Sequence, residues 1–295
     1  MKLALGTVQF GLRYGVANTT GQPGDTEVAD ILRRAAAAGV KILDTACLYG
    51  ESESVLGRCL PADHDFRIVT KTPKFAGMAG VSAAAALKIA FAESCARLRA
   101  PRLYGLLAHD ADDLLGAQGD DIWQAMEALR ADKRVSRIGA SVYDGAQIDA
   151  LLQRYPLDLV QLPLSLLDQR LVQGGQLNRL ARRNIEVHAR SAFLQGALLM
   201  PADSLPRHLA GLRPYVQEIS ARADRLGISP LQAAIRFVSG LPQVAAVVCG
   251  VDSSMHFDQL AAALQQPVPM LSTEDAAACA CADAHLLDPS QWRPA

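Results

Sequence analysis

The sequence predicts a single-domain (β/α)8 barrel, or TIM barrel, and three observations support that prediction. The chain has 295 residues, of which 50% are hydrophobic and 20% charged, a balance typical of a globular protein with a large core. Short apolar runs alternate along the whole chain with longer amphipathic runs, as expected for repeated β–α units. Eight apolar runs of strand length can be distinguished, which is the number that closes such a barrel. Because no linker or low-complexity segment interrupts this pattern, we treat residues 1–295 as one domain.

The expected strands are short runs rich in branched apolar residues. They span residues 2–7, 40–44, 66–71, 103–109, 135–141, 157–161, 185–190 and 244–249. A doubly wound open sheet is the alternative arrangement of the same β–α units. The residues after the first strand argue against it, because residues 6–11 read GTVQFG and lack the GxGxxG spacing of a dinucleotide-binding loop.

The expected helices lie between these strands and carry apolar residues at helical spacing. The first begins at Asp25 or Thr26, which can cap it, and ends before Gly39. Further helices are expected to start at Ser82, Asp120 or Asp121, Asp144, Leu177, Ser229 and Met255. Residues 193–211 form a longer connection that we expect to cross the barrel mouth after strand 7. Residues 273–286 are expected to form a C-terminal helix on the outside of the barrel.

Composition excludes several classes of protein. The formal net charge is −1 and no run of Lys and Arg occurs, so a nucleic-acid-binding surface is not expected. No apolar stretch reaches the roughly 20 residues that span a bilayer, and we expect no signal peptide ahead of the first strand. The six cysteines include no CxxC pair. We therefore expect reduced thiols, no metal site and a cytoplasmic protein; the oligomeric state has no readable signal.

Four chemically active side chains follow three consecutive expected strands. Asp44 ends the second strand and Tyr49 lies in the loop after it, while Lys71 and His109 end the third and fourth strands. In a barrel of this kind the carboxyl ends of the strands meet at one rim, where active sites lie. We therefore expect a carboxylate, a phenol, an ammonium and an imidazole in one place.

Such a set supports proton transfer to or from a carbonyl oxygen. A tyrosine phenol ordinarily has a pKa of about 10, and a neighbouring ammonium lowers it. A carboxylate can hold that ammonium in place, and an imidazole can orient the carbonyl oxygen. The set supplies no hydride, so reduction of a carbonyl requires a nicotinamide cofactor.

In their order and spacing these residues resemble the aldo-keto reductase family, and the resemblance extends over nearly the whole chain. The residues that carry it are Asp44, Tyr49, Gly50, Glu53, Leu56, Gly57, Lys71 and His109. Gly6-Thr7 resembles the family's first-strand motif, residues 138–141 (IGAS) its fifth and residues 160–163 (VQLP) its sixth. The residues from Gly250 onward fall where the family's cofactor loop lies.

The resemblance implies a barrel that binds NADP(H) in extended form without a Rossmann fold. It implies that Tyr49 is the general acid/base, that Lys71 and Asp44 tune it, and that His109 orients the carbonyl. Ser141 and Gln161 match the positions that hold the nicotinamide carboxamide. The residues expected at the cofactor are Gly6, Thr7, Ser141, Gln161, Arg190, Ser191, Phe193, Leu194, Gln195, Gly196, Gly250, Asp252, Ser253 and His256.

The sequence departs from the family pattern at three places. Val142 follows Ser141 where the family has Asn, so one carboxamide contact is lost or replaced. Arg190 stands where strand 7 often ends in a Tyr that stacks on the nicotinamide, and a planar guanidinium can also stack. The segment 247–263 contains no Lys or Arg for the ribose 2′-phosphate of NADP(H), while Asp252 and Asp258 would repel it. We therefore expect NAD(H) to be accepted or preferred, unless a basic residue reaches this loop from elsewhere in the fold.

The expected substrate is a small carbonyl compound or a sugar. Gln9, Tyr14 and Asn18 follow the first strand and, with Arg190, give the pocket rim a polar character. Oxidation of a sugar at its anomeric carbon is as compatible with these residues as reduction. Two other classes of function remain open: a cofactor-binding sensor with little turnover, and a cofactor-free lyase that forms a Schiff base on Lys71.

Overall fold

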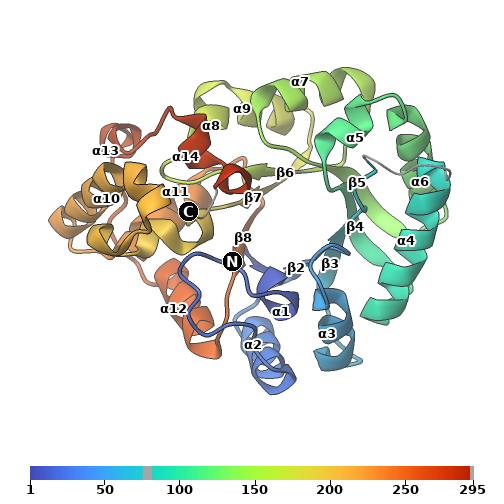
Figure 1. Ribbon diagram of the computed structural model, residues 1–295, viewed down its shortest axis with the longest axis horizontal. Helices are drawn as coiled ribbons and strands as arrows, with labels where there is room; N and C mark the ends of the chain where they lie inside the picture. Colours follow the sequence, from blue (N-terminus) through green and yellow to red (C-terminus); the bar gives the residue numbers. More distant parts are fainter. Residues whose placement is uncertain (76–81, 293–295) are drawn as a thin grey trace.

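Eight parallel strands close into one barrel in the computed structural model, which describes residues 1–75 and 82–292. The strands pair in chain order, and β1 pairs with β8 to complete the circle, with Leu3 opposite Val247 (Figure 1). They are β1 (Leu3–Gly6), β2 (Ile42–Asp44), β3 (Arg67–Lys71), β4 (Leu103–Ala108), β5 (Val135–Ser141), β6 (Leu159–Pro163), β7 (Glu186–Arg190) and β8 (Ala246–Gly250). The predicted (β/α)8 barrel is thereby confirmed.

Helices surround the barrel and follow the strands along the chain (Figure 1). They are α1 (Val8–Gly11), α2 (Asp25–Ala37), α3 (Ser52–Cys59), α4 (Ala83–Leu98), α5 (Ala111–Leu115), α6 (Gly119–Ala131), α7 (Gly145–Arg154), α8 (Arg170–Gln173), α9 (Gln176–Arg182), α10 (Arg213–Arg225), α11 (Pro230–Gly240), α12 (Ser254–Gln265), α13 (Thr273–Ala278) and α14 (Ala284–Leu287). Several start at the residues that the sequence marks as caps, among them Ser82, Asp144 and Ser229. Within the described residues, no helix is long and apolar enough to cross a membrane.

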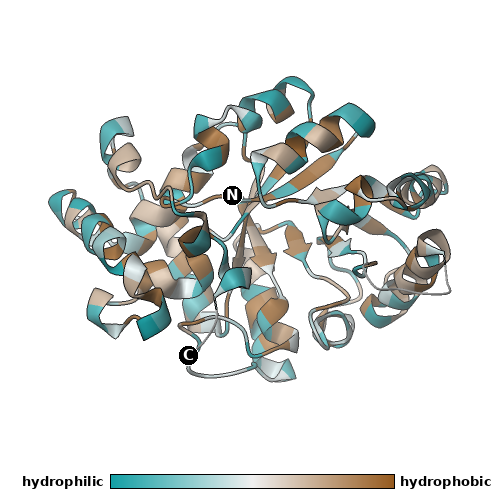
Figure 2. Ribbon diagram, turned by 45° about the horizontal axis from the view of Figure 1, so that its top comes forward, coloured by the Kyte–Doolittle hydropathy of each residue, from teal (hydrophilic) through white to brown (hydrophobic). Residues whose placement is uncertain are grey.

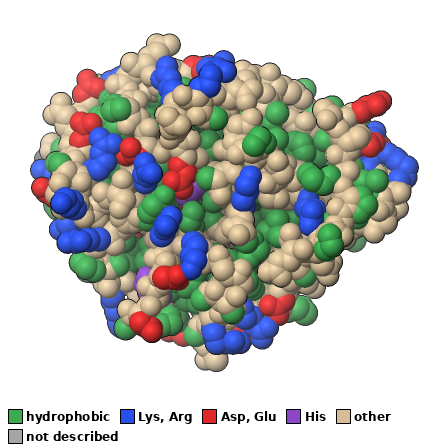
Figure 3. All heavy atoms as spheres, turned by 180° about the vertical axis from the view of Figure 1, so that it is seen from behind, with side chains coloured by type: hydrophobic (Ala, Val, Ile, Leu, Met, Phe, Trp, Pro, Cys, Tyr) green, Lys and Arg blue, Asp and Glu red, His purple; other side chains and the backbone are tan. Residues whose placement is uncertain are grey.

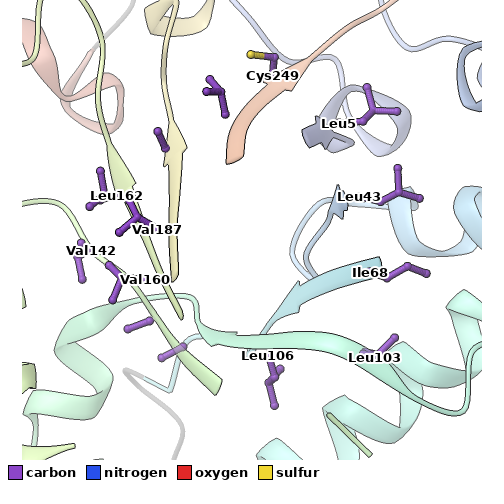
Figure 4. Packing of buried hydrophobic residues seen from close by; sticks show 14 of the residues in the cluster. Leu5, Leu43, Ile68, Leu103, Leu106, Val142, Val160, Leu162, Val187 and Cys249 are labelled. Atoms are coloured by element: carbon purple, nitrogen blue, oxygen red, sulfur yellow. The ribbon is translucent and has the colours of Figure 1, made fainter. Parts of the chain in front are cut away.

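The strands are buried on both faces because successive side chains alternate between the barrel interior and the helices. Val69, Leu107 and Leu159 form a small cluster of their own, whereas the adjacent residues Ile68 and Leu106 belong to the large core. Figure 4 shows Ile68, Leu106 and other members of this large core around the strands. Apolar colour follows the strands and the inner helix faces in Figure 2, while the outer helix faces are polar.

The long connection predicted over residues 193–211 is present between β7 and α10. It contains three 3₁₀ turns, η1 (Leu194–Leu199), η2 (Ala202–Ser204) and η3 (Arg207–Leu212), and then continues into α10, a helix that the sequence analysis did not identify. The tail also differs from expectation. Its helical segment is divided into α13 and α14, because the backbone N–H of Cys281 leaves the helical pattern and donates to the carbonyl of Leu167.

Candidate active site

A cavity of about 590 Å³ opens at the carboxyl ends of the strands. Its lining includes all four residues expected to carry the chemistry, Asp44, Tyr49, Lys71 and His109. It also includes most of the residues expected at the cofactor or the substrate: Gly6, Thr7, Gln9, Tyr14, Asn18, Ser141, Gln161, Arg190, Ser191, Phe193, Gln195, Gly196, Gly250, Asp252 and His256. The strand ends therefore meet at one rim, as the barrel requires.

A buried ion pair joins Lys71 at the end of β3 to Asp44 at the end of β2. Lys71 Nζ lies 2.7 Å from Asp44 Oδ1 and also donates to the carbonyl of Thr45. The second carboxylate oxygen, Asp44 Oδ2, accepts a hydrogen bond of 2.6 Å from Gln161 Nε2 on β6. Burial lowers the pKa of Lys71, but Asp44 and the nearby Tyr49 phenol raise it by more, so the net shift is upward. The ammonium is therefore held in its charged form.

Tyr49 stands directly beside this ion pair. The ammonium of Lys71 lies 4.9 Å from the centroid of the Tyr49 ring. The loop that carries Tyr49 packs so closely on α1 that a Cβ added at Gly11 would lie 1.9 Å from the carbonyl oxygen of Tyr49. Thr7 anchors the start of the same loop, because its backbone N–H and its hydroxyl both donate to the carbonyl of Asp44. The backbone that carries Tyr49 is thus held against Thr7 and α1.

His109 completes the group from the end of β4. Its ring meets the ring of Tyr49 edge-on, with the centroids 5.8 Å apart. Burial, together with the charges of Lys71 and Lys74, lowers the pKa of His109 to about 4. The imidazole is therefore neutral at physiological pH, and its Nδ1 is buried with no hydrogen-bond partner among the described residues. An unpaired polar atom in a cavity is available to a ligand.

Arg190 at the end of β7 is held by two residues that directly follow β5. Its guanidinium lies 4.5 Å from the centroid of the Tyr143 ring, and Nη2 donates to the carbonyl of Val142 at 3.0 Å. Val142 is the residue that replaces the family's Asn, so the two departures from the family pattern meet in space. Tyr143 also lines the cavity, and the sequence analysis did not single it out. Tyr143 could have been predicted, because it follows Ser141 by two residues and therefore lies at the same rim.

The loop after β7 is held in an unusual backbone conformation. Ser191, Leu194 and Gln195 have left-handed φ values of 64°, 46° and 56°, and Gly196 follows with 90°. Such conformations cost non-glycine residues about 1–3 kcal/mol each and persist mainly at functional loops. The carbonyl of Gln195 accepts a hydrogen bond of 3.0 Å from the N–H of Val16, which joins this loop to the loop after β1. The left-handed turn thus forms one wall of the cavity.

The opposite end of the cavity reaches the first turns of α12. Gly250 ends β8, and a Cβ added there would lie 2.2 Å from Oε1 of Gln9, so only glycine leaves room for that side chain. Gln9 Oε1 is itself buried without a hydrogen-bond partner among the described residues. Asp252 accepts a hydrogen bond from Nδ1 of His256, and both line the cavity. Ser253 caps α12 by accepting from the N–H of His256.

The remaining predicted residues either contact the cavity only at its edge or do not line it. Asn18 lines it, but its amide group makes four hydrogen bonds within its own loop, to the backbone of Tyr14, Thr20 and Gly21. Tyr14 lines the cavity at its rim, where the residue is 38% exposed. Leu194 is buried in an apolar cluster, and Ser253 faces its own helix; neither contributes to the cavity lining.

The size and polarity of the cavity fit a dinucleotide cofactor. It extends from the Lys71–Asp44 pair to the first turns of α12 and contains two orphaned buried polar atoms, Gln9 Oε1 and His109 Nδ1. Gln161 uses its amide nitrogen on Asp44 and keeps its carbonyl oxygen for a further donor, such as a carboxamide NH₂.

Comparisons with known proteins agree with the barrel fold. The model of the aldo/keto reductase family matches residues 2–283. Among solved structures, an aldo-keto reductase from Bacillus halodurans in its holo form is similar over 98% of this chain and 92% of its own, with 20% identity and a TM-score of 0.75. Glycerol dehydrogenase from Gluconobacter oxydans is similar over 94% of this chain and 90% of its own, with 22% identity and a TM-score of 0.71. A search of curated proteins found no match.

Members of the matched family are oxidoreductases that generally use NAD(P)H, and the match covers every strand of the barrel. The chain belongs to the aldo/keto reductase family.

Proposed function

We propose that this protein interconverts an aldehyde or ketone with the corresponding alcohol, including a sugar with its oxidation product, and that Tyr49 is the general acid/base. The observation that carries the proposal is the buried Lys71–Asp44 pair beside the Tyr49 ring. A buried ammonium next to a phenol is placed to stabilise the negative charge that the phenol oxygen carries while its proton is transferred. The role of the cofactor is to donate or accept a hydride at the carbonyl carbon.

Each neighbour of Tyr49 has a separate role in this proposal. Lys71 stabilises the phenolate, and Asp44 keeps Lys71 charged and in position. His109 is neutral, so it can donate a hydrogen bond to the substrate oxygen without delivering a full proton. In reduction, Tyr49 gives its proton to the carbonyl oxygen; in oxidation, the phenolate takes the proton of the alcohol.

The cofactor is assigned to the cavity between these residues and α12. Ser141 and Gln161 would hold the nicotinamide carboxamide, and Arg190, already stacked on Tyr143, would lie beside the nicotinamide ring. The remaining contacts would come from the left-handed turn after β7 and from the carboxyl ends of β1 and β8 with the residues that follow them. They comprise Gly6, Thr7, Ser191, Phe193, Gln195, Gly196, Gly250, Asp252 and His256.

We further propose that NAD(H) is accepted at least as well as NADP(H). The acidic side chains Asp252 and Asp258 lie on or next to the first turn of α12, where a ribose 2′-phosphate would need a cation. On the substrate side, Gln9, Tyr14 and Asn18 are polar side chains at the cavity, which favours a small polar carbonyl compound or a sugar.

A Schiff-base mechanism on Lys71 is the less favoured alternative. It requires a neutral amine, whereas the pKa of Lys71 is raised by Asp44 and Tyr49 despite its burial. Borohydride trapping of a carbonyl compound on Lys71 would support this alternative. A cofactor-binding sensor is the other alternative, and it predicts tight binding without turnover.

The test is a comparison of the wild-type protein with Tyr49→Phe. We expect both to bind NADH with the same affinity in a fluorescence titration, because Phe keeps the ring and removes only the hydroxyl. We expect turnover of small polar aldehydes and sugars to fall by about 10²- to 10⁴-fold in the variant, the range that general acid/base catalysis contributes. Tight binding of NADH with no turnover by the wild type on a broad carbonyl panel would favour the sensor. NADPH binding a hundredfold tighter than NADH would contradict the cofactor assignment.

A further inference from the structure

We propose that Glu27 on α2 and Asp258 on α12 select NAD(H) against NADP(H). Glu27 binds a helix N–H group and Asp258 binds the guanidinium of Arg34, two groups that a 2′-phosphate would otherwise use. This inference rests on the function proposed above and assigns its cofactor selectivity to two named side chains. Neither Glu27 nor its helix is adjacent in sequence to the cofactor loop, and the contact exists only in the folded barrel.

The N-terminus of α12 is where the cavity ends. The residues of α12 and of the preceding turn that line it are Val251, Asp252, His256, Gln259 and Leu260. A helix N-terminus attracts anions, because its first N–H groups lack partners within the helix and carry a partial positive charge. A phosphate on the adenosine end of a cofactor would find such a site here if the N–H groups were free.

The protein's own side chains take two of these N–H groups. The N–H of Ser254, the first residue of α12, donates to Oε1 of Glu27 at 2.5 Å. The N–H of His256 donates to Oγ of Ser253 at 3.2 Å, and Asp252 binds the imidazole of His256. Glu27 thus puts a built-in carboxylate where an incoming phosphate would bind.

A basic residue does reach α12 from elsewhere in the fold, but acids engage it. Arg34 on α2 places Nη1 2.5 Å from Oδ2 of Asp258, and its Nε lies 2.8 Å from Oδ2 of Asp30. The two helices lie side by side in Figure 1. The guanidinium that could neutralise a phosphate is therefore shared between two carboxylates.

The resulting charge pattern discriminates between the two cofactors by the charge of the group on the 2′ oxygen. A 2′-phosphate brings nearly two negative charges to a region that already holds Glu27, Asp252 and Asp258. A 2′-hydroxyl is neutral and can donate a hydrogen bond to a carboxylate, as it does at acidic side chains in other NAD sites. The arrangement therefore repels NADP(H) and tolerates NAD(H).

The experiment compares the affinities of the full-length protein for NADH and NADPH by fluorescence titration. The variants are Glu27→Gln, Asp258→Asn and the double variant, with Glu218→Gln as the matched control. Gln can still accept the hydrogen bond from Ser254, so only the charge is removed. Glu218 forms an ion pair with Arg222 within α10, so its variant removes one acidic charge on a different helix from α2 and α12.

We expect the ratio of the NADPH to the NADH dissociation constant to fall by about tenfold or more in the double variant, which corresponds to about 1.4 kcal/mol. The NADH affinity of the double variant and the ratio measured for Glu218→Gln should change little.

A second measurement needs no variant. In the wild type, added salt should lower the ratio of the NADPH to the NADH dissociation constant, because salt screens the repulsion. An unchanged ratio in folded variants, or tighter binding of NADPH by the wild type, would overturn the inference. Failure of the wild type to bind either cofactor would instead overturn the proposed function.

Discussion

Asp44 makes the two contacts that organise the site at the scale of single residues. One carboxylate oxygen binds Lys71 and the other binds Gln161, so three strands, β2, β3 and β6, are tied together across the barrel mouth. A buried ion pair is weak evidence for stability, because desolvation of both charges offsets their attraction. The pair is better explained by the charge that it places beside Tyr49.

The neutral form of His109 leads to a prediction about the pH dependence of stability. Its pKa is about 4 in the folded protein and close to 6.5 in an unfolded chain, so between these values the unfolded state binds more protons. Stability is therefore lost as the pH falls from about 6.5 toward 4. We expect His109→Asn to reduce this loss, measured as the fall in Tm between pH 7 and pH 4.5.

The matched control for this comparison is His208→Asn, because His208 is exposed on the loop after β7. That variant should follow the wild-type pH profile. Equal pH dependence of the wild type and His109→Asn would show that the imidazole of His109 titrates normally in the folded protein.

The residue scale also shows what the sequence could predict. Asp44, Tyr49, Lys71 and His109 are readable because each ends an apolar run or follows one closely, and the barrel brings strand ends together. Glu27 is not readable, because its contact with Ser254 joins residues 227 positions apart along the chain. Nothing in the local sequence of α2 distinguishes Glu27 from an ordinary acidic residue in a first helical turn.

At the scale of elements, the short helix α1 sets the position of the catalytic loop. Gly11 ends α1, and the backbone of the loop after β2 passes so close that no side chain fits between them. We expect Gly11→Ala to displace Tyr49 and to lower kcat/KM by about tenfold or more, since small misplacements of a reacting group are costly. Steady-state kinetics with the best carbonyl substrate would measure this effect.

The control is Gly24→Ala, where an added Cβ meets no atom within 4 Å. That variant should retain its kcat/KM. Wild-type kinetics in folded Gly11→Ala would contradict the assignment of a positioning role to α1.

Helices and strands also differ in how well they can be predicted from the sequence. The eight strands are short apolar runs with clear ends, and all eight were predicted within a few residues. Helix α10 was missed because Pro214 stands next to its start and reads as a break, whereas proline is tolerated in the first turn of a helix. Helix α1 has only four residues, too few for a periodic pattern.

The whole molecule contains a second apolar cluster beside the core that surrounds the barrel strands. It joins the connection after β7 to α10 and the tail, through residues such as Leu209, Ile219 and Cys279. Figure 3 shows the outside of the molecule from behind, where acidic side chains lie among the basic ones. The formal net charge of the whole chain is −1, so the charges of the two signs nearly balance.

Two equally buried leucines test whether the two clusters open together. Leu209 belongs to the second cluster and Leu43 to the barrel core, and both are 0% exposed. Replacement by alanine costs about 2–5 kcal/mol at such sites. We expect Leu209→Ala to speed hydrogen exchange in residues 194–225 and 273–287, and Leu43→Ala to speed it in the strands as well. Identical exchange patterns in the two variants would show a single cooperative unit.

Closure of the barrel by β1 and β8 has a consequence for how the chain folds. The first strand finds one of its two partners only near the end of the chain, with Leu3 opposite Val247. Joining such distant segments carries a large loop-closure entropy, and contacts of long sequence separation slow folding. During synthesis, the edge of β1 must therefore wait for β8, and the last strand to leave the ribosome decides when the barrel becomes complete.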